Sequence, residues 1–402
     1  MIASASDPRG EAVRRTLTTK LQAAGLVFDA ISTDTTSNYF ESDYDDEEWS
    51  EIAAHDAGVR KRAPTVSDPP LRMRGHSKDK RANKPQVVVE AAVSEGYVIH
   101  HDTHPGNTSD KTLIGPTARK LVQRGVGQGA VWVGDAGMNS AKTQEALGEL
   151  RVDWVFGEGQ ARTKEVKEVL SQGGRFRQHP DKPELAFKTV TRGDRLYVIR
   201  LNRSERQRVL RKLGRHLKRI EEELSRGDRA TDHGRRTCRL VGHPTLGKYV
   251  RRAKRGDRLV LNRAAIERER TLAGKSVVST NMEGLHPLPA DDLYRLLFNV
   301  EDAFRSLKSD LDLRPIRHRR SNRIRAHVLV CVMALNVTRH LERKTGRKLS
   351  RLRDLMTPLT AQQLDVGPAT FWESVTLTEE QEAVFEALGY DRPLKRFDVT
   401  IE

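Results

Sequence analysis

A short and nearly continuous apolar run, AVWVG at residues 130–134, is followed directly by an acidic residue, Asp135. Runs of this length with little polar alternation are typical of strands that are covered on both faces, in the interior of an α/β sheet. A second apolar segment, LVFDAIST at residues 26–33, predicts another strand, which ends at Asp34. Because ligand sites of α/β sheets form where strands end, we expect these two carboxylates to meet at one edge of the sheet.

The other strand-like segments indicate a mixed sheet rather than a regular alternation of strand and helix. Two of them, PQVVVEAAV and EGYVIHHDTHP, follow one another without an intervening helix, and VDWVFGE, LAFKTV, RLYVIRLN and KSVVSTN come later. A long basic helix is predicted over residues 204–226, where apolar residues recur at intervals of three and four. The sequence therefore predicts an α/β protein with a mixed sheet and flanking helices.

The chain of 402 residues is strongly basic, with a formal net charge of +16 and a pI near 9.9. A polyanionic partner is the simplest explanation of this excess, although a generally basic proteome would produce the same composition. The basic residues fall into four groups, at residues 74–84, 203–219, 235–258 and 314–325. From the first and last groups we predict Lys78, Arg314 and Arg317 as contacts with nucleic-acid phosphates, whereas the helical group at 203–219 is equally well explained as a solvated face.

The chain has no sequence feature of a secreted or membrane protein. Its two cysteines, Cys238 and Cys331, lack the spacing of a zinc site or a disulfide framework. The first residues lack the apolar core of a signal peptide, and the longest apolar stretch, HVLVCVMALNV, is too short to span a bilayer. We expect a soluble cytoplasmic protein with no membrane partner.

A third acidic residue, Glu301, lies in a predicted helix with two distinct faces. Val300, Phe304, Leu307 and Leu311 recur at helical spacing and predict a buried stripe. Tyr294, Glu301 and Lys308 are seven residues apart and form a second line, with Arg305 four residues after Glu301. This line would hold a carboxylate and cations against a phosphate. A solvated face with a Glu301–Arg305 ion pair is the alternative.

Each carboxylate also has an ordinary structural explanation. Asp34 and Asp135 stand where a turn residue or a helix N-cap is expected. Mg²⁺ prefers a few carboxylate oxygens together with substrate phosphates, so the three acids together predict a metal site on an enzyme that acts on nucleic acid.

Several long segments carry a resemblance to a known family. These segments are DTTSNYFE, GHSKDKRANKPQVVVEAAV, EGYVIHHDTHPGNTSDKT, VWVGDAGMNS and YRLLFNVEDAFRSLKSDLDLRPIRHRRSNRIRAHV. In this order, from about Val27 to about Val337, they resemble a DDE transposase of a bacterial insertion sequence. The resemblance is to the subgroup with a Tyr-Arg-Glu-Lys signature around the third acid.

The resemblance implies a ribonuclease-H-like mixed sheet, interrupted between the second and third acids by a mostly β insertion that contains the long basic helix. It places the catalytic triad on Asp34, Asp135 and Glu301, which would hold two Mg²⁺ ions, with Mn²⁺ as a substitute. It places the signature Tyr and Lys on Tyr294 and Lys308, where they would contact DNA. The signature Arg is replaced by Leu297, and Arg295 and Arg305 are the two candidates for its role.

The expected domains are an N-terminal remnant at 1–26, two halves of the catalytic core at 27–150 and 275–345, an insertion at 151–274 and a C-terminal helical tail at 346–402. Only 33 residues precede Asp34. Relatives usually carry a sizeable region there, so we expect a truncated copy.

The implied function is metal-dependent cleavage at transposon ends followed by 3′-hydroxyl strand transfer into target DNA. Double-stranded DNA is the expected partner, bound by a homodimer in the nucleoid. A nuclease that hydrolyses without joining and an inactive DNA-binding remnant are the alternatives.

Overall fold

The computed structural model describes residues 8–41, 44, 46, 70–79, 81, 83–159, 163–227, 240–253 and 258–401. The chain forms two compact units, which are described separately. Unit 1 comprises residues 1–27, 35–108 and 299–402, and unit 2 comprises residues 28–34 and 109–298. Strand β1 (Ala30–Tyr39) contributes its first half to unit 2 and its second half to unit 1.

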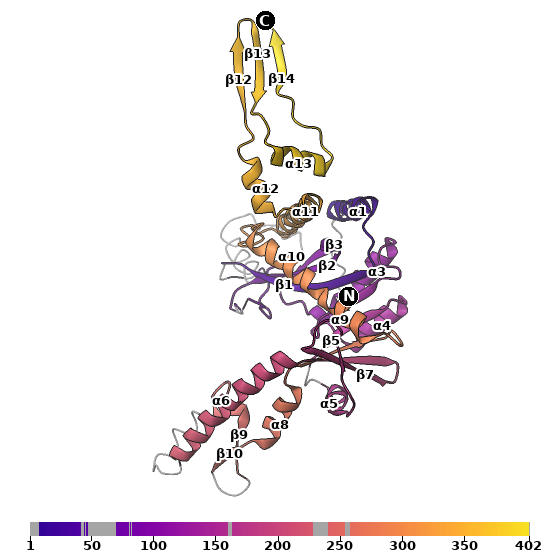
Figure 1. Cartoon of the computed structure of the whole chain (residues 1–402), viewed down its shortest axis with the longest axis vertical. Coiled ribbons are helices and arrows are strands. Elements are labelled where there is room, and N and C mark those ends of the chain that lie inside the picture. The colour runs from indigo at the N-terminus through magenta and orange to yellow at the C-terminus, as the bar shows by residue number, and fades with distance from the viewer. Residues whose placement is uncertain are drawn as a thin grey trace, which may run out of the picture. The chain divides into compact units, whose positions relative to one another are not determined.

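Unit 2 contains a mixed sheet in the order β1-β4-β5-β11-β8-β7-β6 (Figure 1). Strand β4 is parallel to β1 and β5, whereas β11 is antiparallel to both β5 and β8. The strands other than β1 are β4 (Val131–Gly134), β5 (Trp154–Glu158), β6 (Arg177–Gln178), β7 (Leu185–Arg192), β8 (Arg195–Asn202) and β11 (Lys275–Thr280). Trp132 and Val133 are fully buried, so the interior strand predicted from the apolar run is confirmed.

The helices of unit 2 are η1 (Asp110–Thr112), α3 (Ile114–Gln123), α4 (Ala141–Glu149), α5 (Lys164–Ser171), α6 (Arg203–Gly227), η2 (Gly247–Tyr249), α8 (Arg263–Leu272) and α9 (Pro287–Arg295). Ala290 on α9 packs in one core cluster with Val155 of β5 and Val198 of β8. Helix α9 thereby covers one face of this sheet.

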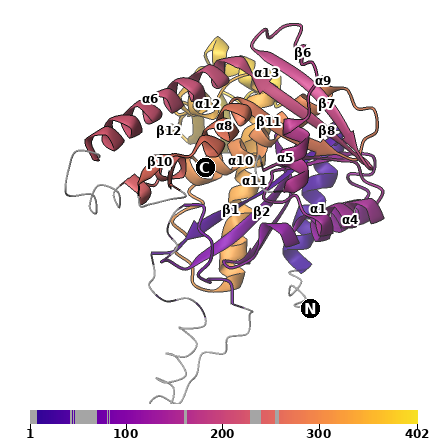
Figure 2. The ribbon, with the colours of Figure 1, turned by 90° about the horizontal axis from the view of Figure 1, so that it is seen from below.

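Helix α6 packs with α8 and with the short strands β9 (Val250–Arg252) and β10 (Leu259–Leu261) around a core of their own (Figures 1 and 2). The helix predicted at 204–226 is therefore confirmed. The prediction for residues 151–274 is a mostly β insertion with one long basic helix. This prediction is wrong in the described part, where helix exceeds strand because α5 and α8 add 8 and 10 residues to the 25 of α6. Strands β7 and β8 instead extend the main sheet of unit 2.

Unit 1 is built on a β-hairpin of β2 (Gln86–Ser94) and β3 (Tyr97–Pro105), with β2 beside β1. The hairpin turn is Glu95–Gly96, and both residues have positive φ, as a two-residue type I′ turn requires. Helix α1 (Pro8–Ala23) packs on β3, where Thr18 Oγ1 donates to the Ile99 carbonyl at 3.0 Å. Residues before β1 thus contribute to the core of unit 1.

Further described helices are α10 (Leu297–Ser309), whose residues from Asn299 on belong to unit 1, and α11 (Ser321–Thr345), α12 (Leu349–Met356) and α13 (Glu379–Leu388) of unit 1. The expected helical tail at 346–402 also contains a separate antiparallel sheet, so this prediction is wrong. Its strands are β12 (Ala361–Val366), β13 (Ala369–Ser374) and β14 (Arg396–Ile401). A two-residue Gly367–Pro368 connection joins β12 to β13, and Gly367 has a φ of 62°. Among the described residues, no helix has the length and apolarity needed to cross a membrane.

Candidate functional site

Asp34 and Asp135 lie on neighbouring parallel strands of unit 2. The last residues paired between β1 and β4 are Thr33 and Gly134, and the next residue in each strand is an aspartate. Adjacent strands are about 4.8 Å apart, so this register brings the two carboxylates side by side. Asp135 directly follows its strand, as predicted.

Asp34 does not end its strand, which corrects the sequence prediction. Strand β1 continues to Tyr39, because the residues after Asp34 include Thr35 and Thr36, whose branched side chains favour extended backbone. The parallel pairing with β4 nevertheless stops at Thr33, one residue before Asp34. The residue therefore stands at the end of the paired region rather than at the end of the strand.

Both aspartates face the side of the sheet that α9 covers. Ser32 and Asp34 share a face because strand side chains alternate, and Ser32 Oγ donates to the Leu296 carbonyl, just after α9, at 3.0 Å. On the next strand, Gly157 follows Phe156, the partner of Gly134, and so falls in register with Asp135.

Gly157 is covered by the ring of Tyr294. A Cβ atom at Gly157 would lie 2.4 Å from Tyr294 Oη, which leaves no room for a side chain. The Tyr294 phenol therefore lies over the position next to Asp135. The sheet register places Asp34, Asp135 and this phenol on one face across three neighbouring strands.

The carboxylate of Asp135 has one oxygen occupied by backbone and one without a donor. Its Oδ1 accepts hydrogen bonds from the N–H groups of Gly137 at 2.8 Å and Met138 at 3.0 Å. Among the described residues, Oδ2 has no hydrogen-bond donor or ion pair. The turn role expected from the sequence is present, and it also fixes the direction of the second oxygen, which suits a cation ligand.

Glu301 lies on α10, where it is exposed. The buried stripe predicted for this helix is confirmed for Val300, Phe304 and Leu307. Arg305 forms an ion pair with Asp302 at 2.9 Å rather than with Glu301. Within the described part of the chain, Glu301 has no ion pair or hydrogen bond, so the alternative Glu301–Arg305 pair does not form.

The single helix predicted from Tyr294 to Lys308 is wrong, because α9 ends at Arg295 and α10 begins at Leu297. The hydrogen bond from Ser32 to the Leu296 carbonyl falls at this break, and a side chain bonded to a helix carbonyl is one cause of such interruptions. Leu297 itself is buried, with 8% of its surface exposed. A charged Arg at that position would have to be desolvated.

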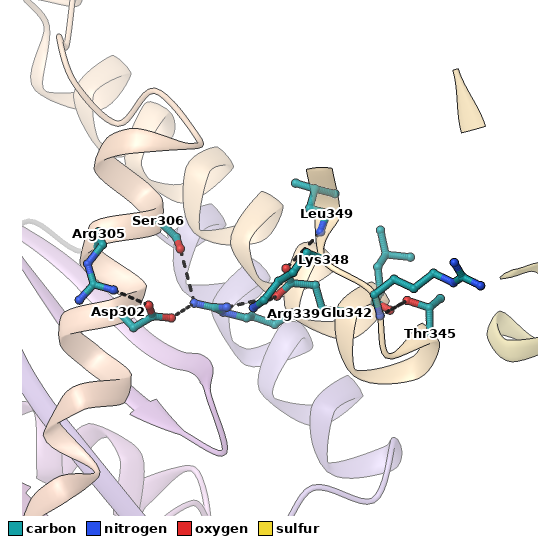
Figure 3. A network of polar contacts seen from close by, with 10 residues as sticks. Asp302, Arg305, Ser306, Arg339, Glu342, Thr345, Lys348 and Leu349 are labelled. Atoms are coloured by element: carbon teal, nitrogen blue, oxygen red, sulfur yellow. Dashed lines mark hydrogen bonds and ion pairs between the residues drawn. The ribbon is translucent and has the colours of Figure 1, made fainter. Parts of the chain in front are cut away.

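Next to Glu301, a polar network fixes α10 to α11 and α12 within unit 1 (Figure 3). Arg339 on α11 contacts Asp302, and it also pairs with Glu342 at 3.2 Å. Glu342 Oε1 in turn accepts from the N–H of Leu349 at 3.1 Å. The network engages the neighbours of Glu301 and leaves its carboxylate outside.

Lys308, predicted to contact DNA, forms an internal ion pair. Its Nζ lies 3.1 Å from Asp79 Oδ1, and Asp79 Oδ2 pairs with Arg314 at 3.3 Å. Only 12% of the Lys308 side chain is exposed, and this burial lowers the pKa of its ammonium group although Asp79 opposes the effect. The lysine therefore anchors α10 through Asp79.

Two other predicted DNA contacts, Lys78 and Arg317, are both exposed but differ in their internal hydrogen bonds. Lys78 is exposed, and its Nζ donates to the carbonyl and the hydroxyl of Thr35, each at 2.7 Å, directly after Asp34. Arg317 is exposed and has no polar contact among the described residues. Arg317 is therefore open to a ligand, whereas Lys78 fixes the backbone of β1.

Sequence reasoning missed Asp79, Ser32 and Gly157. Asp79 is the one acid in the run GHSKDKRANK, and an isolated acid among cations is a signal for an internal ion pair. Ser32 and Gly157 gave no such signal, because their roles depend on which helix covers the sheet. Among the described residues, no group of three or more His, Cys, Asp or Glu side chains is gathered as metal ligands.

Two carboxylates at neighbouring strand ends are ligands of the type that Mg²⁺ prefers, and the strong positive charge of the chain is typical of proteins that bind nucleic acid. The sequence profile described as "Transposase DDE domain" matches residues 49–337. The chain therefore belongs to this family and is a DDE-type transposase by sequence class. Asp135 and Glu301 lie inside the matched range, and Asp34 lies before it.

Solved structures with similarity to the chain include two transposases. The chain is similar to piggyBac transposase in a synaptic complex with hairpin DNA, with 10% identity and a TM-score of 0.39, over 80% of this chain and 49% of that one. It is also similar to Mos1 transposase in a paired-end complex, with 11% identity and a TM-score of 0.19, over 38% of this chain and 43% of that one. The chain thus spans about half the length of the piggyBac chain, and a search of curated proteins finds no match.

The close contact at Gly157 leads to a prediction about the Tyr294 ring. Gly157→Ala is expected to lower the free energy of unfolding by about 1 to 3 kcal/mol, because the new methyl group displaces the ring. Gly148→Ala is the control, since a Cβ there meets nothing and the exposed helix position gains about 0.5 to 1 kcal/mol. Urea unfolding measures both, and equal effects of the two substitutions would contradict the packing.

The internal ion pair leads to a second prediction. Asp79→Ala is expected to destabilise the protein by about 2 to 3 kcal/mol, because it leaves the buried Lys308 ammonium without its acid. Combining it with Lys308→Met should cost less than the sum of the single effects, by at least about 1 kcal/mol. Asp310→Ala, at an exposed position, is the control, expected within about 0.5 kcal/mol of the wild type. Strict additivity in chemical denaturation would show that Asp79 and Lys308 are not coupled.

Proposed function

We propose that this protein cuts DNA at the ends of a mobile element and joins the freed 3′-hydroxyl groups to target DNA by in-line phosphoryl transfer. The observation that carries the proposal is the register of β1 and β4, which puts Asp34 and Asp135 side by side on one face. Membership of the transposase DDE domain family supports the same reaction class.

In this proposal Asp34, Asp135 and Glu301 are the catalytic acids and the metal ligands. The fit rests on Asp135 Oδ2 and the Glu301 carboxylate, neither of which has a partner among the described residues. Two Mg²⁺ ions, or Mn²⁺ in their place, would activate the attacking oxygen and stabilise the leaving one. The chain itself supplies the fixed carboxylates and the cations that hold the DNA.

Several other residues have proposed roles in holding DNA. The Tyr294 phenol, beside Asp135, would contact a phosphate, and the exposed Arg317 would bind another. Arg305 would exchange Asp302 for a phosphate, Arg314 would exchange Asp79, and Lys78 would exchange its contacts with Thr35. Lys308 would act by fixing α10 through Asp79 rather than by direct contact.

We also propose that the sheet is a ribonuclease-H-like core, with residues 151–274 as an insertion that carries α6. The support is the central group of parallel strands β1, β4 and β5, with the β2–β3 hairpin next to β1. Double-stranded DNA, as transposon end and as target, is the proposed partner, and a homodimer on DNA in the nucleoid is the proposed working form.

The test is a cleavage and joining assay with duplexes that carry the ends of the element, in Mg²⁺ and in Mn²⁺. Asp34→Ala, Asp135→Ala and Glu301→Ala should each lower both rates by at least about 1000-fold, because each removes a metal ligand. DNA affinity should stay within about threefold of the wild type. Asp310→Ala, close to α10 but outside the proposed site, should retain activity.

The same assay separates the alternatives. Cleavage without joined product would identify a nuclease that hydrolyses only. Binding of DNA without cleavage, unchanged by Asp135→Ala, would identify a DNA-binding remnant. A melting temperature that rises in Mg²⁺ for the wild type but not for Asp34→Ala or Asp135→Ala would independently locate the metal site.

A further inference from the structure

Helix α6 carries a concentration of positive charge that the carboxylate site does not use. From Arg206 to Ile220 it has seven basic residues and no acidic residue, and its acids are confined to Glu205 and to residues 221–223. Cations three or four residues apart on a helix repel one another, by about 0.2 to 0.5 kcal/mol for each pair. Arg211, Arg215 and Arg219 form such a series. A helix that only needs solubility would alternate these cations with acids.

The basic residues of α6 divide into paired and unpaired ones. Near its ends, Arg208 pairs with Glu205 at 2.7 Å, and Arg226 pairs with Glu223 at 3.5 Å. Four central residues are exposed and have no ion pair or hydrogen bond among the described residues. These four, Lys212, Arg215, Lys218 and Arg219, are named here the cation face.

The cation face points away from the core that holds α6. At 100° per residue the four side chains fall within an arc of about 120°, opposite to the apolar side. On that apolar side, Leu213 and Ile220 are buried against Tyr249, Val250 and Ile266 of η2, β9 and α8. Packing therefore fixes the rotation of the helix and holds the cation face in solvent. Figures 1 and 2 show α8 and β10 on the same side of α6.

We propose that the cation face binds the sugar–phosphate backbone of double-stranded DNA outside the carboxylate site, a role that rests on the proposed function. From Lys212 to Arg219 the helix rises about 10 Å, the length of about three phosphates along one strand of the duplex. Because the face consists of Lys and Arg alone, it contacts phosphates and reads no base sequence.

The position of α6 in unit 2 indicates which part of the DNA duplex the cation face contacts. The helix begins directly after β8, which is separated from β4 by β5 and β11. Three strand spacings are about 14 Å, and the cation face begins at Lys212, about 14 Å along α6 from its first residue. DNA on the cation face is therefore several base pairs from the phosphodiester at Asp135, so the face binds flanking DNA and not the reacting bond.

The test compares two variants of the full chain with equal losses of charge. The first, K212Q/R215Q/K218Q/R219Q, removes the cation face, and Gln preserves helix propensity. The control, R208Q/R226Q/K248Q/R270Q, removes four cations of the same region that are each paired with an acid. DNA affinity is measured by fluorescence anisotropy with a 40-base-pair duplex, from low to high salt.

The slope of the logarithm of affinity against the logarithm of salt concentration should fall by about 3 to 4 for the first variant, because each phosphate contact contributes about 0.9. Its affinity near 0.15 M salt should weaken at least about tenfold, whereas the control should stay within about threefold of the wild type. Equal slopes for the two variants would overturn the proposal. Circular dichroism melts establish that both variants are folded.

His216 gives a second readout that a purely structural helix would not change. Burial lowers the pKa of this imidazole, and Lys212, Arg215, Lys248 and His243 lower it further. Phosphates that neutralise Lys212 and Arg215 should therefore raise the pKa of His216 when DNA binds, as measured by NMR titration. An unchanged pKa in saturating DNA would contradict binding at the cation face.

The two proposals fail in different ways. With DNA in excess, the first variant should still cleave in Mg²⁺, since its carboxylates are intact. A reduced salt dependence of DNA affinity in the first variant, with cleavage retained, supports DNA binding at the cation face. A wild type that never cleaves, but whose slope depends on the four cations, would refute the transposition chemistry and leave the DNA surface in place.

Discussion

The parallel pairing of β1 with β4 is the constraint on which the candidate site depends. Four consecutive backbone pairs, ending at Thr33 and Gly134, put two aspartates next to each other although 100 residues separate them in the chain. Two carboxylates on strands about 4.8 Å apart repel one another, so the arrangement costs free energy unless a cation lies between the two aspartates. The register of the sheet keeps the two aspartates together, because a shift of β1 by one residue would turn its buried side chains to the opposite face.

The acidic side chains around the site are of two kinds: some form internal ion pairs, and others form no ion pair among the described residues. Asp79 neutralises Lys308 and Arg314, and Asp302 is engaged by Arg305 and Arg339. These pairs satisfy the charges that burial would otherwise penalise. Glu301 directly precedes Asp302 in sequence and has no hydrogen bond or ion pair among the described residues. Because its carboxylate makes no structural contact there, Glu301 is available to bind a metal ion.

The sequence predicted much of this arrangement, and the misses have physical causes. The interior strand before Asp135, the buried stripe of α10 and the amphipathic α6 were predictable, because each depends on local periodicity. The break at Leu296 was not, since it coincides with a hydrogen bond from Ser32, far away in the chain. The ion pair of Lys308 was missed for the same reason, as its partner Asp79 is 229 residues away. The C-terminal strands were missed because none of the residues of β12 and β13 is buried, so no apolar and polar alternation marks them.

The pairing state of each cation, rather than its position in a basic cluster, indicates which ones are open to DNA. Lys78, Arg314 and Lys308 stand in or beside basic runs but have internal acceptors, so binding DNA would require an exchange of partners. The cation face of α6 loses no internal contact when a phosphate approaches. The affinity gained from counterion release at the cation face is therefore not reduced by the cost of breaking an internal ion pair. For this reason a charge count from sequence overstates the contribution of Lys78, Arg314 and Lys308 relative to that of the cation face.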